Sequence, residues 1–147
     1  MRDTKRSLPI ALLRAREKVM EPVREMLSQS QISEQKWRVL RVIEESGPVE
    51  QTVIATKACL LLPSLTRIIH ALEKEQLVTR KASTLDRRKS IVTITDAGRA
   101  LISKHSAQSN QIFTELEEQF GSEKLDTLLD LLEELQLVQL TPGRKNR

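Results

Sequence analysis

The chain has 147 residues, of which 39% are hydrophobic and 30% charged, which is typical of one globular domain with or without a helical extension. Aromatic residues make up only 2% and Tyr is absent, which argues against an RNA-binding platform that stacks bases on several rings. The formal net charge is +4 and the sequence pI about 9.5, which is compatible with a polyanionic partner.

The residue types that support catalysis or metal binding are sparse. Two His residues far apart in the sequence and a single cysteine, Cys59, give no metal-ligand cluster, and no nucleophile elbow, phosphate loop or dinucleotide fingerprint is found. We therefore expect no enzyme, no metal and no cofactor. A single cysteine can form no internal disulfide, which fits a reducing cytoplasm. The chain has no apolar run of ~20 residues, so we expect it to be neither secreted nor membrane-spanning.

The first predicted element is a helix that Ser7 caps and that Pro9 enters in its first turn. Pro22 lies inside it and should bend the helix or split it in two. Arg16 interrupts the apolar row of this helix and allows two interpretations. It is either a paired arginine at a helix interface or a cation that awaits an anionic ligand.

A second helix is predicted to begin after Ser33, which is a good N-cap, and to end at the breaker 46–48. Ile32 and Trp37 stand at the two positions that close a hydrophobic staple. A third helix, about residues 50–57, is followed by a turn at residues 58–60. Pro63 then enters the first turn of a fourth helix.

The fourth helix and the two β-runs after it carry the pattern that indicates DNA binding. The helix spacing buries Leu65, Ile68, Ile69 and Leu72 and leaves polar side chains on the opposite face. The β-runs, residues 78–81 and 91–95, are joined by a loop that contains a row of cations. This order predicts a mainly α fold with a small β-hairpin (α+β), namely a winged helix-turn-helix. A small α+β domain with a solvated charge run is the plainer alternative.

The C-terminal part is predicted to be two helices. The first begins at Asp96 with Thr95 as N-cap and runs to about residue 119; its apolar row is Ala97, Leu101, Ile112 and Leu116, with His105 and Gln108 in the middle. The second, residues 123–138, has a seam of Leu125, Leu128, Leu132 and Leu135. We interpret residues 33–95 as the winged helix-turn-helix domain and residues 1–32 and 96–147 as a helical dimerisation region.

Charge and apolar surface are unevenly distributed along the chain. The hairpin cations are opposed only by Asp86, whereas residues 115–134 hold eight acidic residues against Lys124 alone. Such segregation suits a protein that docks on DNA by one face. The terminal helices carry more apolar surface than a wing domain of this size can cover, which predicts a homodimer. An intrachain helix bundle is the alternative.

Several short motifs resemble the MarR family of bacterial transcriptional regulators. They are the start of the fourth helix at residues 63–67, the run Leu72-Glu73 with Leu77-Val78 and Arg80, the wing Asp86-Arg87-Arg88, and Ile94-Thr95 with Gly98. The chain departs from the family at Gln76 and Cys59, where Gly is usual, which leaves the loop geometry open. Residues 8–17, 34–38 and 58–66 are further similar to the subgroup that controls degradation of aromatic acids such as 4-hydroxyphenylacetate.

The resemblance implies a homodimer on a pseudo-palindromic operator in double-stranded DNA. A small aromatic carboxylate, bound between the dimer helices and the wing domain, would release the DNA. The resemblance places the DNA contacts on Ser64, Thr66 and Arg67, with His70 added from the same helix face, and on Asp86, Arg87, Arg88 and Lys89 of the wing. Asp86 would orient Arg88, and Arg87 or Arg88 would enter the minor groove.

For the ligand, the candidates are Arg16 as the carboxylate partner, Trp37 as an aromatic wall and His105 as a polar group. The alternatives are a core role for Trp37 and a satisfied interface histidine at 105. A regulator of antibiotic or oxidant response, with a different phenolic inducer or Cys59 as a redox sensor, is the second functional hypothesis. The apolar run around Cys59 argues for an inert thiol. A helical interaction adaptor would explain the leucine seam but not the basic wing.

Overall fold

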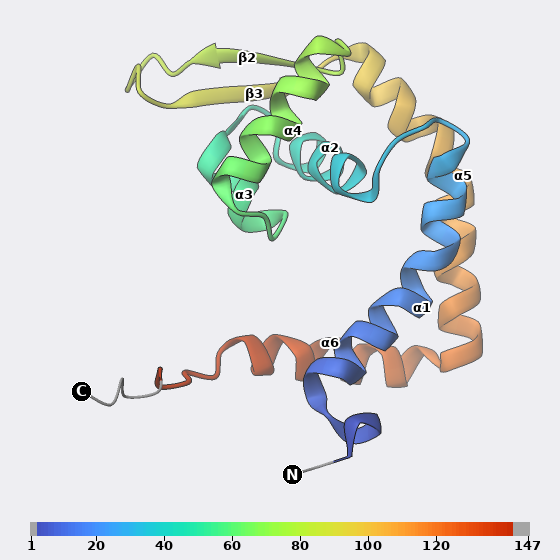
Figure 1. Cartoon of the computed structure of the whole chain (residues 1–147). Helices are drawn as coiled ribbons and strands as arrows, with labels where there is room; N and C mark the ends of the chain where they lie inside the picture. Colours follow the sequence, from blue (N-terminus) through green and yellow to red (C-terminus); the bar gives the residue numbers. More distant parts are fainter. Residues whose placement is uncertain (1–2, 143–147) are drawn as a thin grey trace. The chain divides into compact units, whose positions relative to one another are not determined.

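The computed structural model describes residues 3–142 and divides the chain into two compact units, residues 1–110 and 111–147. The predicted helical fold with a small sheet is confirmed (Figure 1). The elements are η1 (Thr4–Arg6), α1 (Leu8–Ser28), α2 (Glu34–Ser46), β1 (Val49–Glu50), α3 (Gln51–Lys57), α4 (Leu62–Lys74), β2 (Val78–Ala82), β3 (Ser90–Ile94), α5 (Asp96–Phe120) and α6 (Ser122–Gln136).

The sheet has one strand more than the predicted hairpin. Its order is β1-β3-β2, with antiparallel pairing throughout. Val78 pairs with Ile94 across the hairpin, and Val49 of the added strand pairs with Val92. The third predicted helix therefore begins at Gln51, because Glu50 belongs to β1. In Figure 1 the hairpin lies beside α4.

The axes of α3 and α4 are bent by 111° across the turn of residues 58–61, within the range of about 90–120° for a helix-turn-helix. Cys59 has φ +55° in this turn. Its N–H donates to the Thr56 carbonyl, and the Leu60 N–H donates to the Ala55 carbonyl. This is the left-handed cap that helices adopt most readily at Gly. Gln76 ends α4 in the same way, with φ +62°. At both positions where the chain lacks the Gly that is usual in the MarR family, the backbone therefore still adopts the left-handed turn that Gly favours.

We find no single helix in residues 3–142 that could span a membrane. None of these helices is long and apolar enough by itself to cross a membrane, and α3 and α4 satisfy the length and composition test only together, as the bent pair.

The core of residues 3–110 is built from the end of α1, from α2, α3, α4 and the sheet, and from the first half of α5. Leu65, Ile69 and Leu72 of α4 are fully buried, as the helical spacing predicts, while Ile68 is half-buried. Ser33 caps α2 by accepting a hydrogen bond from the Lys36 N–H at 3.1 Å. The other fully buried large side chains include Met26, Leu27, Leu40, Ile43, Ile54, His105, Val39, Val78 and Val92.

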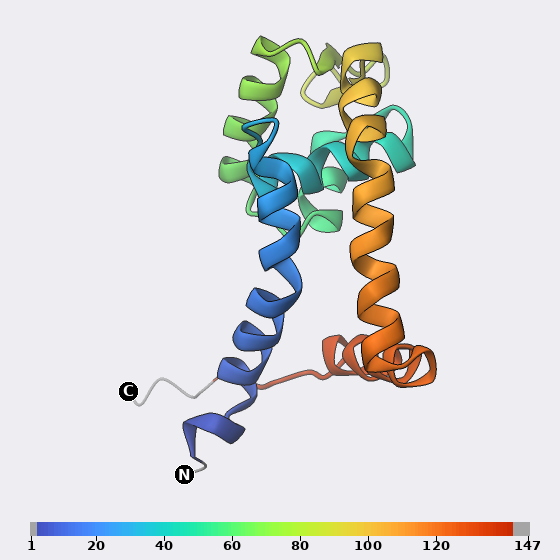
Figure 2. The ribbon, with the colours of Figure 1, turned by 90° about the vertical axis from the view of Figure 1, so that its right-hand side faces the viewer.

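The helix α1 is continuous from Leu8 to Ser28 (Figure 2). Of the two predicted effects of Pro22, the split is therefore wrong, and the bend stays a prediction. Pro22 removes one backbone hydrogen bond, but the following turn buries Val23, Met26 and Leu27, and this packing holds the helix together. Ser7 is at the N-cap position, yet its side chain makes no capping hydrogen bond. The N-terminal half of α1 leaves Leu8, Leu12 and Leu13 exposed.

The helix α5 starts as predicted but buries a different face. The Gly98 N–H donates to Thr95 Oγ1 at 3.0 Å, which confirms the cap. The buried row is Gly98, Ile102, His105 and Ser109, whereas Ala97 is exposed and Leu101 half-buried. Of the predicted apolar row, the described chain buries only the central His105; Leu101, Ile112 and Leu116 are half-buried, and their cover by a second copy stays a prediction. Gly98 selects the observed face, because a Cβ there would meet Ile94 Cγ1 at 2.6 Å and clash with the Leu77 carbonyl.

Residues 111–142 contain the end of α5 and the helix α6. α6 follows Gly121, which has φ +107° and confirms the predicted break. The helix ends at Gln136, two residues before the predicted end, and none of its side chains is buried. Leu128, Leu129, Leu131 and Leu135 are between 38% and 56% exposed. The predicted domain boundaries at 32/33 and 95/96 stay a prediction, and residues 1–2 and 143–147 lie outside the described part.

Candidate nucleic-acid interface and ligand site

The polar face of α4 lies opposite its buried face. Arg67 and His70 are exposed, and Ser64 and Thr66 are half-buried. In the described part of the chain Arg67 forms no ion pair. The Thr66 hydroxyl is engaged twice: it donates to the Leu62 carbonyl at 3.0 Å and accepts from Gln51 Nε2 at 2.9 Å. A row of hydrogen-bonding side chains on an exposed helix is what base-edge recognition requires.

The wing loop between β2 and β3 is an ordered turn. Ser83 is buried, its N–H donates to the Lys89 carbonyl at 2.8 Å, and its Oγ accepts from the Leu85 N–H at 3.2 Å. Asp86 accepts from the Arg88 N–H at 3.0 Å, and its carboxylate lies 3.5 Å from Arg88 Nε. The structure thus contains the Asp86–Arg88 ion pair that the resemblance implies.

The wing projects its cations outward. The Arg88 side chain is 94% exposed, and Arg87 and Lys89 are exposed beside it. At the base of the wing, Lys89 Nζ lies 3.7 Å from a carboxylate oxygen of Glu50 in β1. The exposed cations of α4 and the wing outnumber the nearby acids, so this surface attracts a polyanion.

A crevice of about 180 Å³ lies between α4, the candidate recognition helix, and the wing. Its walls come from the end of β1 and the start of α3, from the first turns of α4, and from the end of the wing loop with the first residue of β3. The lining residues are Glu50, Gln51, Thr52, Leu62, Thr66, Arg88, Lys89 and Ser90. Sequence reasoning missed Glu50 and Gln51, because no periodicity links the start of α3 to a residue of α4 or to the wing.

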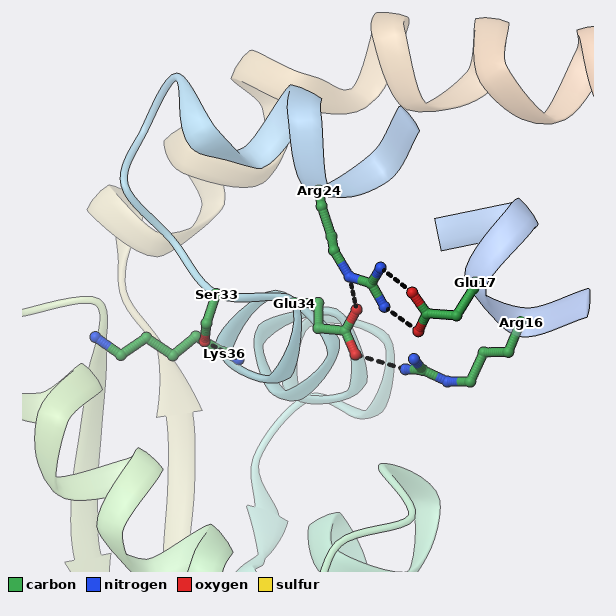
Figure 3. A network of polar contacts seen from close by, with 6 residues as sticks. All are labelled: Arg16, Glu17, Arg24, Ser33, Glu34 and Lys36. Atoms are coloured by element: carbon green, nitrogen blue, oxygen red, sulfur yellow. Dashed lines mark hydrogen bonds and ion pairs between the residues drawn. The ribbon is translucent and has the colours of Figure 1, made fainter. Parts of the chain in front are cut away.

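Arg16, a ligand candidate, lies in a network of ion pairs between α1 and α2 (Figure 3). Its Nη2 is 2.6 Å from Glu34 Oε1, and Arg24 Nε donates to the other Glu34 oxygen at 2.9 Å. Arg24 also binds Glu17 through both of its terminal nitrogens, at 2.7 and 2.8 Å. This pairing is the first of the two interpretations of Arg16, the arginine at a helix interface.

The network shifts the pKa values of three residues, Glu17, Arg24 and Glu34. Burial works against the charged form of Glu34, yet the hydrogen bonds from Arg16 and Arg24 outweigh it and lower the pKa of this carboxyl. The hydrogen bonds from Arg24 likewise lower the pKa of Glu17. The bonds to Glu17 and Glu34 raise the pKa of Arg24. All these groups stay charged at neutral pH.

The other two ligand candidates contact each other. The rings of Trp37 and His105 meet edge to face, with centroids 5.8 Å apart and planes at 84°. Both side chains are buried, and His105 Nε2 lies 2.7 Å from the Ser30 hydroxyl. Burial, and then the charge of Lys104, lower the pKa of His105. The neutral imidazole is thus hydrogen-bonded within the fold, as the interface-histidine alternative expects.

Sequence reasoning missed two arginines of α2. In the described residues, the buried Nε atoms of Arg38 and Arg41 have no hydrogen-bond partner. Arg41 uses Nη2 to reach Glu45 at 3.1 Å. It also lies four residues after Trp37, so both side chains project from one side of the helix. The sequence signal that could have identified Arg41 is its spacing of four residues from the aromatic Trp37.

A helix pair bent by 111° and followed by a cationic β-hairpin defines a DNA-binding regulator of the winged helix-turn-helix class. The sequence profile of the MarR family matches residues 32–90. The homoprotocatechuate degradative operon repressor of Escherichia coli is 38% identical over 128 residues, which are 87% of this chain and 86% of that protein. The chain belongs to the MarR family of transcriptional regulators.

Solved structures agree with this assignment. NadR in complex with 4-hydroxyphenylacetate superposes with a TM-score of 0.82 at 34% identity, covering 95% of this chain and 99% of that one. The transcriptional repressor CouR, bound to a 23-mer DNA duplex, gives a TM-score of 0.76 at 29% identity, covering 90% and 94% of the two chains.

Proposed function

We propose that this protein is a transcriptional repressor of an aromatic-acid degradation operon, acting in the cytoplasm without catalytic activity. It binds a pseudo-palindromic operator as a homodimer and is released by a small aromatic carboxylate. The observation that carries DNA binding is the crevice at which the polar face of α4 meets the exposed cations of the wing. The similarity to a homoprotocatechuate degradative operon repressor supports the choice of operon.

In this proposal α4 enters the major groove. The exposed Arg67 side chain binds base edges. Ser64, Thr66 and His70 contact neighbouring bases or phosphates. Arg87 or Arg88 enters the minor groove, and Asp86 orients Arg88. Lys89 lies at the base of the wing, where it neutralises a phosphate.

The exposed apolar surfaces of α1 and α6 support a homodimer. Leu12 of α1 and Leu128 and Leu135 of α6 are among the side chains that a second copy would cover. A dimer reads two half-sites when its recognition helices lie about 34–36 Å apart. An effector that favours a different spacing lowers DNA affinity by its differential affinity for the two states.

The DNA-binding part is tested by comparing Arg67→Ala with Arg88→Ala in fluorescence anisotropy on a selected operator and on unrelated duplex. We expect Arg67→Ala to weaken operator binding about 5- to 150-fold and unrelated duplex much less. Arg88→Ala should weaken both and make the salt dependence shallower. Arg14→Ala, which removes an exposed cation of α1, is the control for lost charge. Equal losses from Arg67→Ala on both duplexes would reduce Arg67 to a phosphate contact.

For the effector we propose a site beside Trp37, with Arg16 or Arg41 as the carboxylate partner and His105 at its polar end. Arg16 would have to share its guanidinium with Glu34, whereas the buried Nε of Arg41 has no partner in the described part of the chain. Arg41 is therefore the stronger candidate. Calorimetry with 4-hydroxyphenylacetate separates them: loss of binding in Arg41→Ala but not Arg16→Ala supports this order, and undiminished binding in both removes both arginines from the site.

A second candidate function is oxidant sensing, favoured by one observation. Cys59 is exposed in the turn that leads into α4, although the apolar run around it suggested an inert thiol. Oxidation there would alter the start of the recognition helix. Peroxide that releases the operator from the wild-type protein but not from Cys59→Ser would support this function, and an insensitive complex would exclude it.

A further inference from the structure

The contact between Gln51 and Thr66 has only one possible direction. The Thr66 hydroxyl has a single hydrogen, and it donates that hydrogen to the Leu62 carbonyl at 3.0 Å. Toward Gln51 the hydroxyl can only accept, so the donor is the amide nitrogen Nε2, 2.9 Å away. The orientation of the Gln51 amide is therefore set by its partner. Thr66 retains one lone pair and cannot donate to a base or phosphate.

The same bond leaves Gln51 with two unused groups. Its Oε1 accepts, and the second hydrogen on Nε2 donates. Gln51 is half-buried and lines the crevice between α4 and the wing. Asn and Gln recognise adenine with this pair of groups, accepting from N6 and donating to N7. Gln51 can hold Thr66 with one amide hydrogen and bind a base with the other.

The backbone around Gln51 fixes the position of the amide. Gln51 begins α3 directly after β1, where Glu50 pairs with Ile91 of β3. The Glu50 carboxylate is 3.7 Å from Lys89 Nζ at the base of the wing. Two consecutive residues thus contact the two parts of the interface: Gln51 binds Thr66 of α4, and Glu50 pairs with Lys89 of the wing. A side chain held in this way keeps its geometry before DNA arrives, which favours specific reading.

We propose that Gln51 is a specificity-determining residue of the DNA interface, which holds Thr66 as an acceptor and reads an adenine with its remaining amide groups. This proposal rests on the DNA-binding function proposed above. It assigns Thr66 a narrower role than the sequence suggested: Thr66 accepts a hydrogen bond from a base or from water and contributes no donor.

The test is selection of duplexes from a randomised library by the wild-type protein, Gln51→Ala and Thr66→Val. We expect the wild-type site to contain, in each half, an A·T pair whose preference disappears in Gln51→Ala. Thr66→Val should relax the same or the adjacent position, because both side chains form one contact. On the wild-type site, Gln51→Ala should bind about 5- to 150-fold more weakly, with unrelated duplex affected less than about twofold and the salt slope unchanged.

Three further variants sharpen the result. Gln35→Ala removes an exposed glutamine from the first turn of α2 and should leave the selected sequence unchanged. Thr66→Ser keeps the hydroxyl that accepts from Gln51 and should therefore select the same sequence as the wild type. The double variant Gln51→Ala/Thr66→Val should lose less than the product of the single losses, since the two residues are in contact. Thermal melting verifies that each variant is folded.

The outcomes separate this proposal from the function on which it rests. A wild-type protein that selects no sequence would overturn the proposed function. A wild-type protein that selects a site, together with a Gln51→Ala variant that selects the same site with the same affinity, would overturn only the role of Gln51. Equal weakening of Gln51→Ala on every duplex would also overturn it, because Gln51 would then be a backbone contact.

Discussion

Residues 3–110 and residues 111–142 use their apolar side chains in opposite ways. The first region surrounds fully buried residues such as Leu40, Leu65 and Val92 with helices and a sheet. The second region carries as clear an apolar pattern, yet no side chain of α6 is buried. Helical spacing thus specifies which face of a helix is apolar but not what covers that face. In the first region the chain itself covers that face, except along the N-terminal half of α1. For that half and for the second region we propose another copy.

The two regions also differ in charge. The described surface around the wing presents Arg87, Arg88 and Lys89, while residues 115–134 are strongly acidic. An acidic helix repels DNA, so it cannot share the role of the wing. Its leucines suit a contact between proteins. The predictions below test each half of this contrast.

The largest effect is expected from the double change Leu128→Asp/Leu135→Asp. In a symmetric dimer each leucine is lost twice. Leu128 is 41% and Leu135 38% exposed in the single chain, so burial of the remaining surface contributes about 1 kcal/mol for each of the four side chains, and the buried carboxylates add a desolvation cost. The dissociation constant of the dimer should rise by about 10³-fold or more. Analytical ultracentrifugation measures it, with Glu133→Gln on the same helix as control. A variant that remains dimeric at micromolar concentration would show that these leucines lie outside the interface.

A smaller effect, confined to the first region, is expected from Gly98→Ala. The added Cβ would meet Ile94 Cγ1 and the Leu77 carbonyl, and overpacking of this kind costs about 1–3 kcal/mol. Urea denaturation followed by circular dichroism measures the free energy of unfolding. Ala97→Ser, at an exposed neighbouring position, should change it little. A Gly98→Ala protein as stable as the wild type would contradict the close approach of α5 to the sheet.

A pH effect is expected from His105. Its folded pKa lies below the unfolded value, because burial and Lys104 disfavour the imidazolium. The unfolded chain then binds more protons, so this contribution to stability is complete above about pH 6.5 and is lost as the pH falls below it. The loss is at most about 1.4 kcal/mol per pH unit. Urea titrations at pH 7.5 and 5.5 should show a smaller change for His105→Gln than for the wild type, and equal changes would remove His105 as the cause.

The smallest effect is expected at the left-handed turn residue Cys59. A non-glycine residue there costs about 1–2 kcal/mol, and the extra freedom of glycine in the unfolded chain cancels part of the gain. Cys59→Gly should therefore stabilise the protein by about 0.5–1 kcal/mol. Cys59→Ala keeps the strain and should be close to neutral in the same thermal melt. Destabilisation by Cys59→Gly would mean that the cysteine side chain makes a contact worth more than the strain.

Local signals in the sequence were sufficient for the order of the elements. Ser33, Thr95 and Gly121 act as caps and breakers through hydrogen bonds and dihedral angles of their own segment, so their role is visible without the fold. The bent pair of α3 and α4 followed by the hairpin also comes from short-range patterns. These are the parts of the fold that the sequence predicted correctly.

Features that depend on distant neighbours could not be predicted. β1 has only two residues, too few for an alternation, and it exists because β3 offers it partners. The buried face of α5 is set by the close approach at Gly98 and not by its most apolar row. The pairing of Arg16 with Glu34 and the hydrogen bond between Gln51 and Thr66 join residues that no local pattern connects.

The most direct test of the central claim is the salt dependence and stoichiometry of wild-type binding to its selected operator. Two chains should bind one duplex, and a dimer with ~6–10 phosphate contacts should lose about 10³–10⁵ in affinity between roughly 50 and 200 mM potassium chloride. A single bound chain, or an affinity that does not change with salt, would contradict the account in which the α4 helices and wings of two copies hold the DNA.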